Sequence, residues 1–407
     1  MMRNRLSRRV FLATGSATAA ALAVAQPAVA AQGGGGLRAE GQPMPANVRL
    51  PAEPPRPRRS DSVGFAIVGL GDYAINWMMP RFQNTQRAHV AAVVSGNPDK
   101  ARRIGEAYGV PADARYDYQT FEAIARDPRI EAVYIALPSG LHAEWTERAF
   151  AAGKHVLCEK PMALSSAEGA RMIAASERAQ RKLMIAYRCH FEPHNLLAMD
   201  LMAQKALGPL RLIRSDQEYR MRPVTPAQNW RLSRALAGGG PLEDFGLYGL
   251  QAALYLAQEM PEAVTASGFR PAGDPRFTEV FAHVGTQLRF PSGAIAQLST
   301  SYDSSGANTI EVRGATGALT MDPAIGYSGH KMRLRQAGQA SRDLTPGDPD
   351  VQFWRQVDHF VDAIRDGTRI KTPGEMGLRD VRLMEAIYAS VASGRTIGLN
   401  PDGTMRA

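Results

Sequence analysis

The sequence predicts an α/β protein with two folded parts: an N-terminal, doubly wound parallel sheet and a C-terminal α+β domain with a largely antiparallel, open sheet. Between residues 63 and 188, short apolar runs alternate with helical segments, which is the rhythm of a parallel sheet. After residue 257, short strands follow one another without helices, which is typical of antiparallel pairing. With 407 residues, the chain is long enough for two cores, and the expected domains are residues 63–188 and 189–407.

A glycine-rich turn directly after the first apolar run is the strongest local signal. The run is residues 64–68, and the turn has the pattern GxGxxA: Gly69, Leu70, Gly71, Asp72, Tyr73 and Ala74. The first glycine suits a tight turn, the second leaves room for a pyrophosphate, and the alanine lets helix and strand pack closely. A helix to Met79 and a second apolar strand from His89 to Ser95 are expected next. This order predicts a Rossmann unit whose helix N-terminus faces the phosphates of a dinucleotide.

The residues after the second strand favour NADP(H) over NAD(H). Ser95, Gly96 and Asn97 stand where NAD enzymes usually carry an acidic residue for the ribose hydroxyls. No carboxylate is there to repel a 2′-phosphate, and Lys100 and two arginines follow. Small polar groups backed by cations suit a phosphate. The alternative is that these cations lie on a solvated helix face.

Later strands of the predicted sheet place polar residues at their carboxyl ends. Strands are expected at residues 132–137, 155–158 and 183–187, with helices at 142–152 and 166–180. In open parallel sheets, ligands bind beyond the carboxyl ends of the strands. The candidates there are Leu137, Pro138, His142, Glu159, Lys160 and Arg188. Glu159 and Lys160 could also form a surface ion pair, but the turn at Pro161 favours a functional lysine.

Three motifs together resemble the Gfo/Idh/MocA oxidoreductases. They are the glycine turn, Glu159-Lys160-Pro161, and residues 238–248, which read GGGPLEDFGLY. Within that family the chain is most similar to the glucose–fructose oxidoreductase branch, which shares Tyr187-Arg188-Cys189-His190 and Trp230-Arg231-Leu232. The resemblance covers nearly all of the chain after residue 30. Two departures from the wider family are Tyr248, where most members have histidine, and Ser139-Gly140.

The resemblance implies a homo-oligomer, dimer or tetramer, that keeps NADP(H) tightly bound. Hydride would pass from an aldose, which leaves as lactone, to a second sugar, which leaves as polyol. Trp230 and Arg231 would contact the cofactor, and the sugar would contact Lys160, Arg188, His190, Arg231, Asp244 and Tyr248. Two alternatives stay open: an NADP-dependent sugar dehydrogenase that releases its cofactor, and a non-catalytic sensor that binds sugar or nucleotide. Lys160 and Tyr248 argue against the sensor, because binding alone needs no acid–base pair.

The expected catalytic residues Lys160, Asp244 and Tyr248 suit proton transfer. Asp244 and Tyr248 are four residues apart, so they share one face of the helix expected after the three glycines. A tyrosine hydroxyl has a pKa near ~10, too high for a base at neutral pH. We expect the ammonium of Lys160 to lower that pKa, so that Tyr248 takes the proton of a sugar hydroxyl. The alternatives are a core tyrosine and an aspartate favoured by the helix dipole.

The first 30 residues have the pattern of an export signal. Ser7-Arg8-Arg9-Val10-Phe11-Leu12 is a twin-arginine motif, an apolar stretch to Ala25 follows, and Ala28-Val29-Ala30 offers a cleavage site. This order predicts the twin-arginine export machinery as a partner and the periplasm as the location. That route carries folded proteins, so the cofactor would be loaded before export. Residues 31–62 are expected to be a flexible spacer or an arm that docks on a neighbouring subunit.

Composition argues against several other classes. The net charge of +9 includes four arginines of the leader, and the remaining excess is scattered, without a basic stripe or zinc-ligand spacing. We therefore expect no nucleic acid partner and no metal. No long apolar run follows the leader, so no membrane anchor is expected in the mature form. Cys158 and Cys189 are expected at the ends of neighbouring strands, as buried free thiols.

The C-terminal part predicts strands followed by two helices. Apolar residues on both sides of Pro291-Ser292-Gly293 indicate a hairpin, and three short apolar runs between residues 310 and 334 indicate further strands. An apolar stripe from Phe353 to Ile364 predicts one helix. Thr372-Pro373-Gly374-Glu375 is expected to start the last helix as a capping box. The open face of the sheet could pair subunits.

Overall fold

The structure is a computed structural model that describes residues 44, 48, 50–51 and 59–406. The expected export signal and most of the expected arm lie outside the described residues. Among those described, no helix is long and apolar enough to cross a membrane. The same part of the chain contains no cluster of three or more His, Cys, Asp or Glu side chains that could hold a metal ion.

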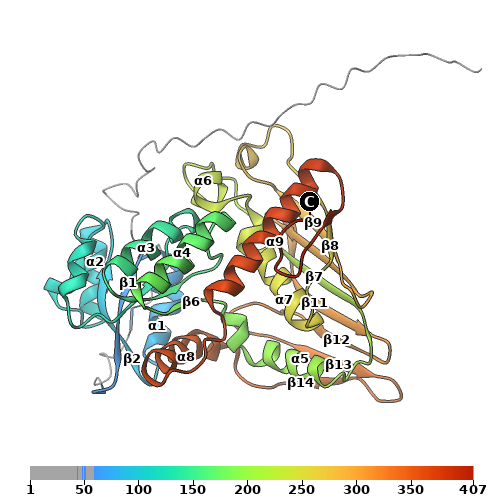
Figure 1. Cartoon of the computed structure of the whole chain (residues 1–407), viewed down its shortest axis with the longest axis horizontal. Helices are drawn as coiled ribbons and strands as arrows, with labels where there is room; N and C mark the ends of the chain where they lie inside the picture. Colours follow the sequence, from blue (N-terminus) through green and yellow to red (C-terminus); the bar gives the residue numbers. More distant parts are fainter. Residues whose placement is uncertain (1–43, 45–47, 49, 52–58, 407) are drawn as a thin grey trace, which may run out of the picture. The chain divides into compact units, whose positions relative to one another are not determined.

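A six-stranded parallel sheet forms the N-terminal part, in the order β3-β2-β1-β4-β5-β6 (Figure 1). Its strands are β1 (Val63–Val68), β2 (Ala88–Val94), β3 (Arg115–Tyr116), β4 (Ala132–Ile135), β5 (His155–Cys158) and β6 (Leu183–Ile185). All residues of β1 are buried, as expected for a central strand covered on both faces. The order is that of the Rossmann fold, and it reverses between β1 and β4, where ligands bind beyond the carboxyl ends of the strands.

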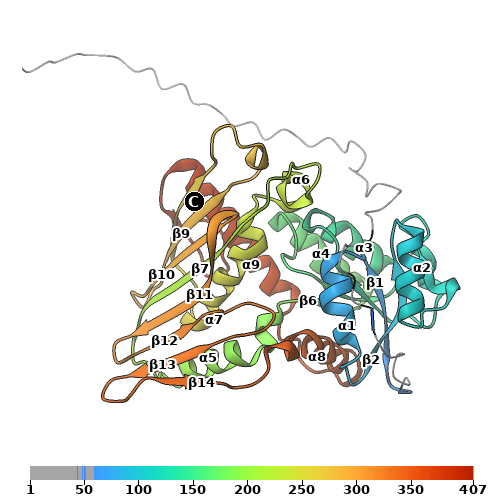
Figure 2. The same ribbon diagram turned by 180° about the vertical axis from the view of Figure 1, so that it is seen from behind.

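Helices cover both faces of this sheet. They are α1 (Met79–Phe82), α2 (Pro98–Ala107), α3 (His142–Ala151) and α4 (Ser166–Ala179). In Figure 1, α3 and α4 lie in front of the sheet, whereas α1 lies in front of it in Figure 2. The helix expected to end at Met79 differs, because it starts as a π-helical turn, Ala74–Met78, and continues as α1. The strands expected to reach Leu137 and Tyr187 each end two residues earlier.

A nine-stranded sheet forms the C-terminal part, in the order β14-β13-β12-β11-β7-β10-β9-β8-β15. Its strands are β7 (Leu210–Arg220), β8 (Ala263–Phe269), β9 (His283–Arg289), β10 (Ile295–Ser301), β11 (Asp303–Gly314), β12 (Gly317–Met321), β13 (Met332–Gln336), β14 (Arg342–Leu344) and β15 (Ile397–Gly398). Every neighbouring pair is antiparallel except β7 with β10. The expected α+β domain and the expected β9–β10 hairpin are therefore confirmed.

The central strand β7 has no counterpart among the expected strands. Its inward positions carry Ile213, Ser215 and Gln217, so the apolar alternation that identifies a strand is weak. Helix α7 (Leu247–Ala257) packs on β7 and is joined on the inner side by α5 (Pro193–Ala203). The approach of α7 is close, because a side chain at Gly249 would place its Cβ 2.8 Å from the Ser215 hydroxyl. Small and polar residues at this contact let helix and strand meet.

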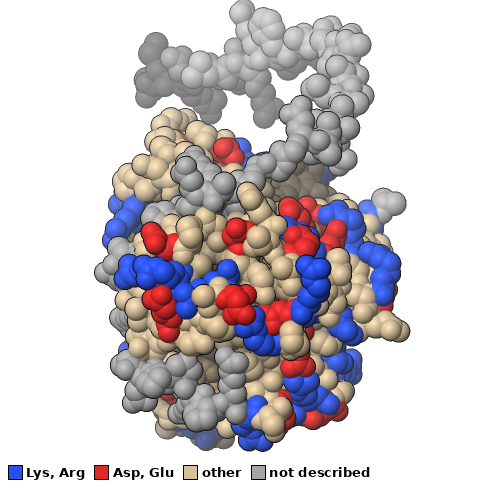
Figure 3. Space-filling view, turned by 90° about the vertical axis from the view of Figure 1, so that its left-hand side faces the viewer, with Lys and Arg blue, Asp and Glu red and all other residues tan. Residues whose placement is uncertain are grey.

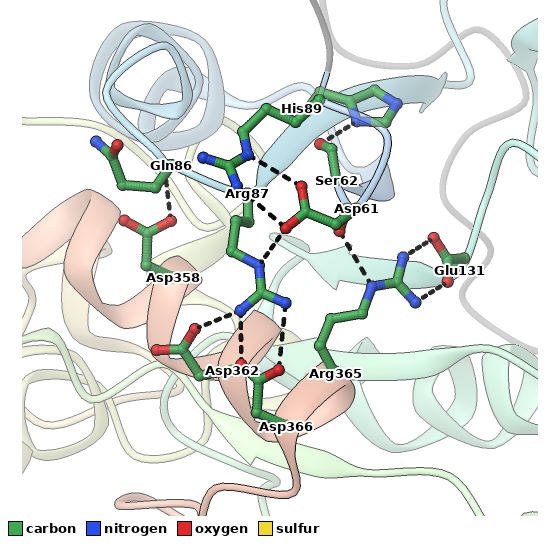
Figure 4. Close-up of polar contacts among 11 residues, drawn as sticks. Asp61, Ser62, Gln86, Arg87, His89, Glu131, Asp358, Asp362, Arg365 and Asp366 are labelled. Carbon is green, nitrogen blue, oxygen red and sulfur yellow. Dashed lines mark hydrogen bonds and ion pairs between the residues drawn. The ribbon is translucent and has the colours of Figure 1, made fainter.

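Helix α8 (Gln352–Asp366) packs on the Rossmann sheet, although it follows the C-terminal sheet in the chain. The expected apolar stripe is present, and the Phe360 ring lies 6.4 Å from that of Phe65 in β1. Ion pairs also join α8 to the Rossmann domain (Figure 4). The guanidinium of Arg87 pairs with Asp61, Asp362 and Asp366, at 2.6 Å to Asp366 Oδ2. Arg365 donates two hydrogen bonds of 2.6 Å to Glu131. These six residues are the α8 cluster.

The last helix, α9 (Gly374–Ser393), begins without the expected capping box. Its N-terminus has no side-chain cap, and the hydroxyl of Thr372 donates instead to the carbonyl of Ile185, at 2.7 Å. Thr372 is fully buried beside β6, so it completes a strand end rather than a helix end.

Two smaller expectations concern surface charge and cysteines. Cys158 and Cys189 are buried and free; Cys158 ends β5, but Cys189 lies in a 3₁₀ turn after β6 rather than at a strand end.

On the face of the molecule in Figure 3, Lys and Arg are interspersed with Asp and Glu. The scattered charge of the sequence is therefore also scattered on this face.

Candidate active site

The glycine turn has the geometry of a dinucleotide site. Gly69 has a positive φ of 93°, and a Cβ there would lie 2.6 Å from the Ala136 carbonyl oxygen, so only glycine fits. At Gly71 a Cβ would meet nothing within 4 Å, so the backbone faces open space that a pyrophosphate can approach. The ammonium of Lys100 donates to the carbonyl of Leu70, at 3.1 Å, and this hydrogen bond stabilises the turn. The residues present therefore fit the phosphates of a dinucleotide.

The residues expected to read the 2′-position hold the start of α2. Asn97 Oδ1 accepts from Lys100 N, at 2.9 Å, as the helix N-cap, and Ser95 Oγ accepts from Asn97 N, at 3.2 Å. Lys100 is 4% exposed, and burial lowers the pKa of its ammonium. Lys100 is thus no part of a solvated face, whereas Arg102 and Arg103 are exposed. A role of these residues toward NADP stays a prediction.

Two loops at the carboxyl edge of the sheet are joined by His142. Its ring lies 2.9 Å from the carbonyl of Leu137 and 2.7 Å from that of Pro161. Burial lowers the pKa of His142, against the effect of these two carbonyls. At 1% exposure the ring is enclosed, so its contacts position the loops on which Pro138 and Lys160 lie. Its observed contacts are with the chain's own backbone, and its expected role toward the cofactor stays a prediction.

Lys160 lies between Asp244 and Tyr248. Its ammonium donates to the backbone carbonyl of Asp244, at 2.6 Å, and lies 3.6 Å from Asp244 Oδ1. The same nitrogen is 4.8 Å from the centre of the Tyr248 ring. Lys160 follows β5, whereas Asp244 lies in a π-helical turn, Leu242–Gly246, and Tyr248 in α7. The structure therefore brings the three expected catalytic residues together, with Asp244 on a π-helical turn and Tyr248 on α7 rather than both on one α-helix.

Asp244 is held as a carboxylate by its neighbours. Its Oδ2 accepts hydrogen bonds of 3.0 Å from Arg231 Nε and from the Tyr302 hydroxyl. Burial raises the pKa of Asp244, but the charges of Arg231 and Lys160 and the Tyr302 hydroxyl outweigh it, so the net pKa is lowered. Tyr302 carries no motif, and only the fold shows that it reaches this carboxylate. Asp244 can thus orient a ligand hydroxyl while keeping its charge.

The hydroxyl of Tyr248 is bound by Arg188, not by Lys160. Arg188 Nε donates to it at 3.1 Å, and the guanidinium lies 4.6 Å from the ring centre. Burial raises the pKa of Tyr248 above its ordinary value, although Arg188 acts in the opposite direction. The expectation of a lowered Tyr248 pKa is therefore wrong: the pKa is raised, because burial outweighs the nearby charges. The hydroxyl is neutral at pH 7 and can donate a proton.

Three further expected residues have contacts of other kinds. His190 is buried, its Nε2 lies 2.8 Å from Gln251 Oε1, and burial lowers its pKa to about 4. It therefore faces α7 and does not join the cluster. Trp230 supports Arg231, whose guanidinium is 4.7 Å from the indole ring. Glu159 accepts from the Tyr134 hydroxyl, at 2.6 Å, and burial raises the pKa of its carboxyl.

A dinucleotide turn together with a buried cluster of a lysine, an aspartate and a tyrosine fits the class of dinucleotide-dependent oxidoreductases. Residues 63–187 match the oxidoreductase family with an NAD-binding Rossmann fold, and residues 196–320 match the GFO/IDH/MocA C-terminal domain. The chain belongs to the Gfo/Idh/MocA oxidoreductase family.

Several relatives extend this assignment. An aldose–aldose oxidoreductase from Caulobacter crescentus, solved with glycerol, is 44% identical with a TM-score of 0.80, covering 83% of this chain and 100% of that one. A D-xylose 1-dehydrogenase (NADP(+)) from Haloferax volcanii is 30% identical, covering 83% and 99% of the two chains. The 3-ketoreductase KijD10 from Actinomadura kijaniata, solved with NADP and TDP-benzene, is 25% identical with a TM-score of 0.71, covering 81% and 98%.

Proposed function

We propose that the chain is an NADP(H)-dependent sugar oxidoreductase that retains its cofactor and passes hydride between two sugars in a ping-pong cycle. An aldose, as the cyclic hemiacetal, loses a hydride from C1 and a proton from its hydroxyl and leaves as lactone. A second sugar gains the hydride and the proton at its carbonyl and leaves as polyol. The observation that carries the proposal is the 44% identity with the full length of the aldose–aldose oxidoreductase.

The chain's own residues perform the proton transfer in this scheme. The bound nicotinamide supplies the acceptor and donor of hydride. The neutral hydroxyl of Tyr248 donates a proton to the carbonyl of the second sugar and regains one from the aldose hydroxyl. Arg188, 3.1 Å away, stabilises the phenolate in between. Asp244, kept ionised by Arg231 and Lys160, accepts a hydrogen bond from a sugar hydroxyl and fixes the sugar's orientation.

Export supports retention of the cofactor. From the twin-arginine pattern of residues 1–30, we propose a periplasmic enzyme that crosses the membrane folded. The periplasm has no pool of nicotinamide nucleotides, so an exported enzyme must load NADP(H) beforehand and keep it. A cycle in which one sugar reduces what the other reoxidises needs no nucleotide supply.

The test is the nucleotide content of the purified mature protein. Denaturation should release about one NADP(H) per subunit, and glucose with a second sugar should turn over without added nucleotide. Protein that is free of nucleotide and active only with added NADP⁺ would contradict the proposal.

That contrary result would support a second candidate, an NADP-dependent sugar dehydrogenase that releases its cofactor. The 30% identity with a D-xylose 1-dehydrogenase (NADP(+)), over 99% of its length, favours this candidate. Steady-state kinetics separate the two, because the dehydrogenase would show saturation with added NADP⁺ and would need no second sugar.

A further inference from the structure

An aromatic side chain of the C-terminal domain reaches across to the dinucleotide turn. Tyr327 lies between β12 and β13, and its ring centre is 4.4 Å from that of Trp77 and 6.2 Å from that of Tyr73. Tyr73 belongs to the glycine turn, and Trp77 to the π-helical turn that follows it. The two domains are therefore in direct contact beside the dinucleotide turn.

Tyr327 also contacts Arg188, the residue that binds the Tyr248 hydroxyl. The guanidinium of Arg188 lies between two rings, 4.7 Å from the centre of Tyr327 and 4.6 Å from that of Tyr248. Arg188 also donates to the carbonyls of Ile325, at 2.6 Å, and Gly326, at 3.0 Å. Arg188 thus holds the loop that carries Tyr327, and a movement of this loop would disturb the partner of the Tyr248 hydroxyl.

Helix α8 supports the same contact from behind. The ring of Phe353 lies 5.2 Å from Tyr327 and 6.4 Å from Tyr73. The guanidinium of Arg81 lies 5.0 Å from the centre of Phe353 and 5.2 Å from that of Trp77. Four rings from three separate segments therefore pack together; we name Tyr73, Trp77, Tyr327 and Phe353 the aromatic clasp.

We propose that the aromatic clasp retains the dinucleotide, with Tyr327 as the residue that closes it. The inference deepens the proposed function and rests on the cofactor retention stated there. The ring contacts of Tyr327 hold the turn in the shape that fits a dinucleotide, so a bound dinucleotide is released faster once the turn separates from the β12–β13 loop. That separation breaks the ring contacts of Tyr327 with Trp77 and Tyr73. Such contacts add stabilisation beyond the area they bury, so they slow release.

The test measures release of NADPH from the reduced holoenzyme by its fluorescence after mixing with excess NADP⁺. Tyr327→Ala and Trp77→Ala should each release NADPH about 2- to 10-fold faster than the unaltered chain. Tyr327→Phe keeps the ring and should stay close to the unaltered rate. The double variant should release no faster than the faster single variant, because both changes break one contact. Phe281→Ala is the matched control, since this ring stacks on Tyr388, away from the turn.

Each outcome separates the clasp from the proposed function. Unchanged release from Tyr327→Ala, or equal acceleration in Phe281→Ala, would overturn the clasp. If the unaltered protein carries no nucleotide, retention fails as a function, and the same release assay with added NADPH still compares the variants. Tyr327→Leu, which keeps apolar bulk without a ring, replaces Tyr327→Ala if the latter does not fold.

Discussion

Two clusters of charged side chains join the C-terminal part of the chain to the Rossmann domain, and they differ in burial. In the candidate active site, the side chains of Lys160 and Asp244 are only 13% and 16% exposed, although that of Arg231 is 37% exposed. In the α8 cluster, those of Asp362 and Asp366 are 44% and 51% exposed, although that of Arg87 is 22% exposed, so the contrast lies in the carboxylates. Exposed charges are screened by water and salt, so their pairing contributes little, whereas buried charges change the pKa values of their neighbours. The number of ion pairs in a cluster is thus a poor guide to its contribution to stability and to pKa shifts, and the burial of its charges is a better one.

The largest effect is expected at the buried hydroxyl of Tyr248. Tyr248→Phe keeps the ring and removes only the hydroxyl, so turnover should fall about 10²–10⁴-fold while the fold and the bound cofactor are retained. Stopped-flow reduction of the bound cofactor by glucose reports one half-reaction directly. Tyr116→Phe is the control, because its hydroxyl donates to Asp127, which is not an expected site residue. A Tyr248→Phe enzyme with an unaltered rate would remove the proposed role.

The next effect is expected when the buried ion cluster loses its anion. Asp244→Asn leaves Arg231 and Lys160 without their carboxylate and should lower the free energy of unfolding by about 3 kcal/mol, the lower end for a broken buried pair. Urea unfolding measures it. The matched variant in the exposed cluster is Asp366→Asn, for which we expect no resolved change. Equal effects of the two substitutions would contradict the distinction by burial.

A third prediction uses Glu243, which lies next to Asp244 but has neutral hydrogen-bond partners, Gly239 N and the Tyr388 hydroxyl. Burial raises its pKa to about 7 from an ordinary value of 4.5, against the effect of these hydrogen bonds. The folded state therefore binds this proton more tightly than the unfolded state. Its contribution is complete below pH ~4.5 and is lost as the pH rises through about 7, by about 3 kcal/mol in total.

The substitution that tests this sign is Glu243→Gln, which cannot titrate. The difference in unfolding free energy between the unaltered chain and the variant should change between pH 4.5 and 7 and stay constant above it. A constant offset reports the altered hydrogen bonds and does not bear on the sign. The exposed Glu375→Gln is the control and should show no such slope.

The smallest effect is expected in the α8 cluster. Arg87→Gln should lower the melting temperature only slightly, because the charges around it are solvated. The difference should vanish at about 1 M salt, where the screening length falls to ~3 Å. Calorimetry at low and high salt measures both. A large, salt-independent loss would show that this cluster behaves like a buried one.

Local patterns predicted what lies close together in the sequence. The glycine turn and the βα rhythm predicted the Rossmann sheet, because each strand and helix declares itself within about thirty residues. The resemblance placed Lys160, Asp244 and Tyr248 in one site, and the structure brings them together. The identity of the Tyr248 partner could not be predicted in this way. The Arg188 guanidinium is held beside Tyr248 by contacts with Ile325, Gly326 and Gln352, all far along the chain.

Burial and packing partners were the part that the sequence could not supply. The stripe on α8 predicts an amphipathic helix but not the surface it covers, and it covers the other domain. Strand β7 was not predicted, because its inward positions are partly polar and weaken the apolar alternation. Thr372 matched a capping box, yet its hydroxyl donates instead to the carbonyl of Ile185 at the end of β6. In each case a distant segment decided between two locally acceptable arrangements.

The position of α8 has a consequence for the order in which the protein is completed during synthesis. Phe360 is fully buried against Phe65, so the sheet that begins at residue 63 receives part of its core from a helix made some 290 residues later. The ribosome has produced most of the chain before that surface can be covered. A fragment ending before Gln352 would leave apolar residues of β1 and β2 without their partner. We propose that this protein is exported only when folded. Although the leader is synthesised first, export would then begin only after α8 has been synthesised and has packed on the sheet.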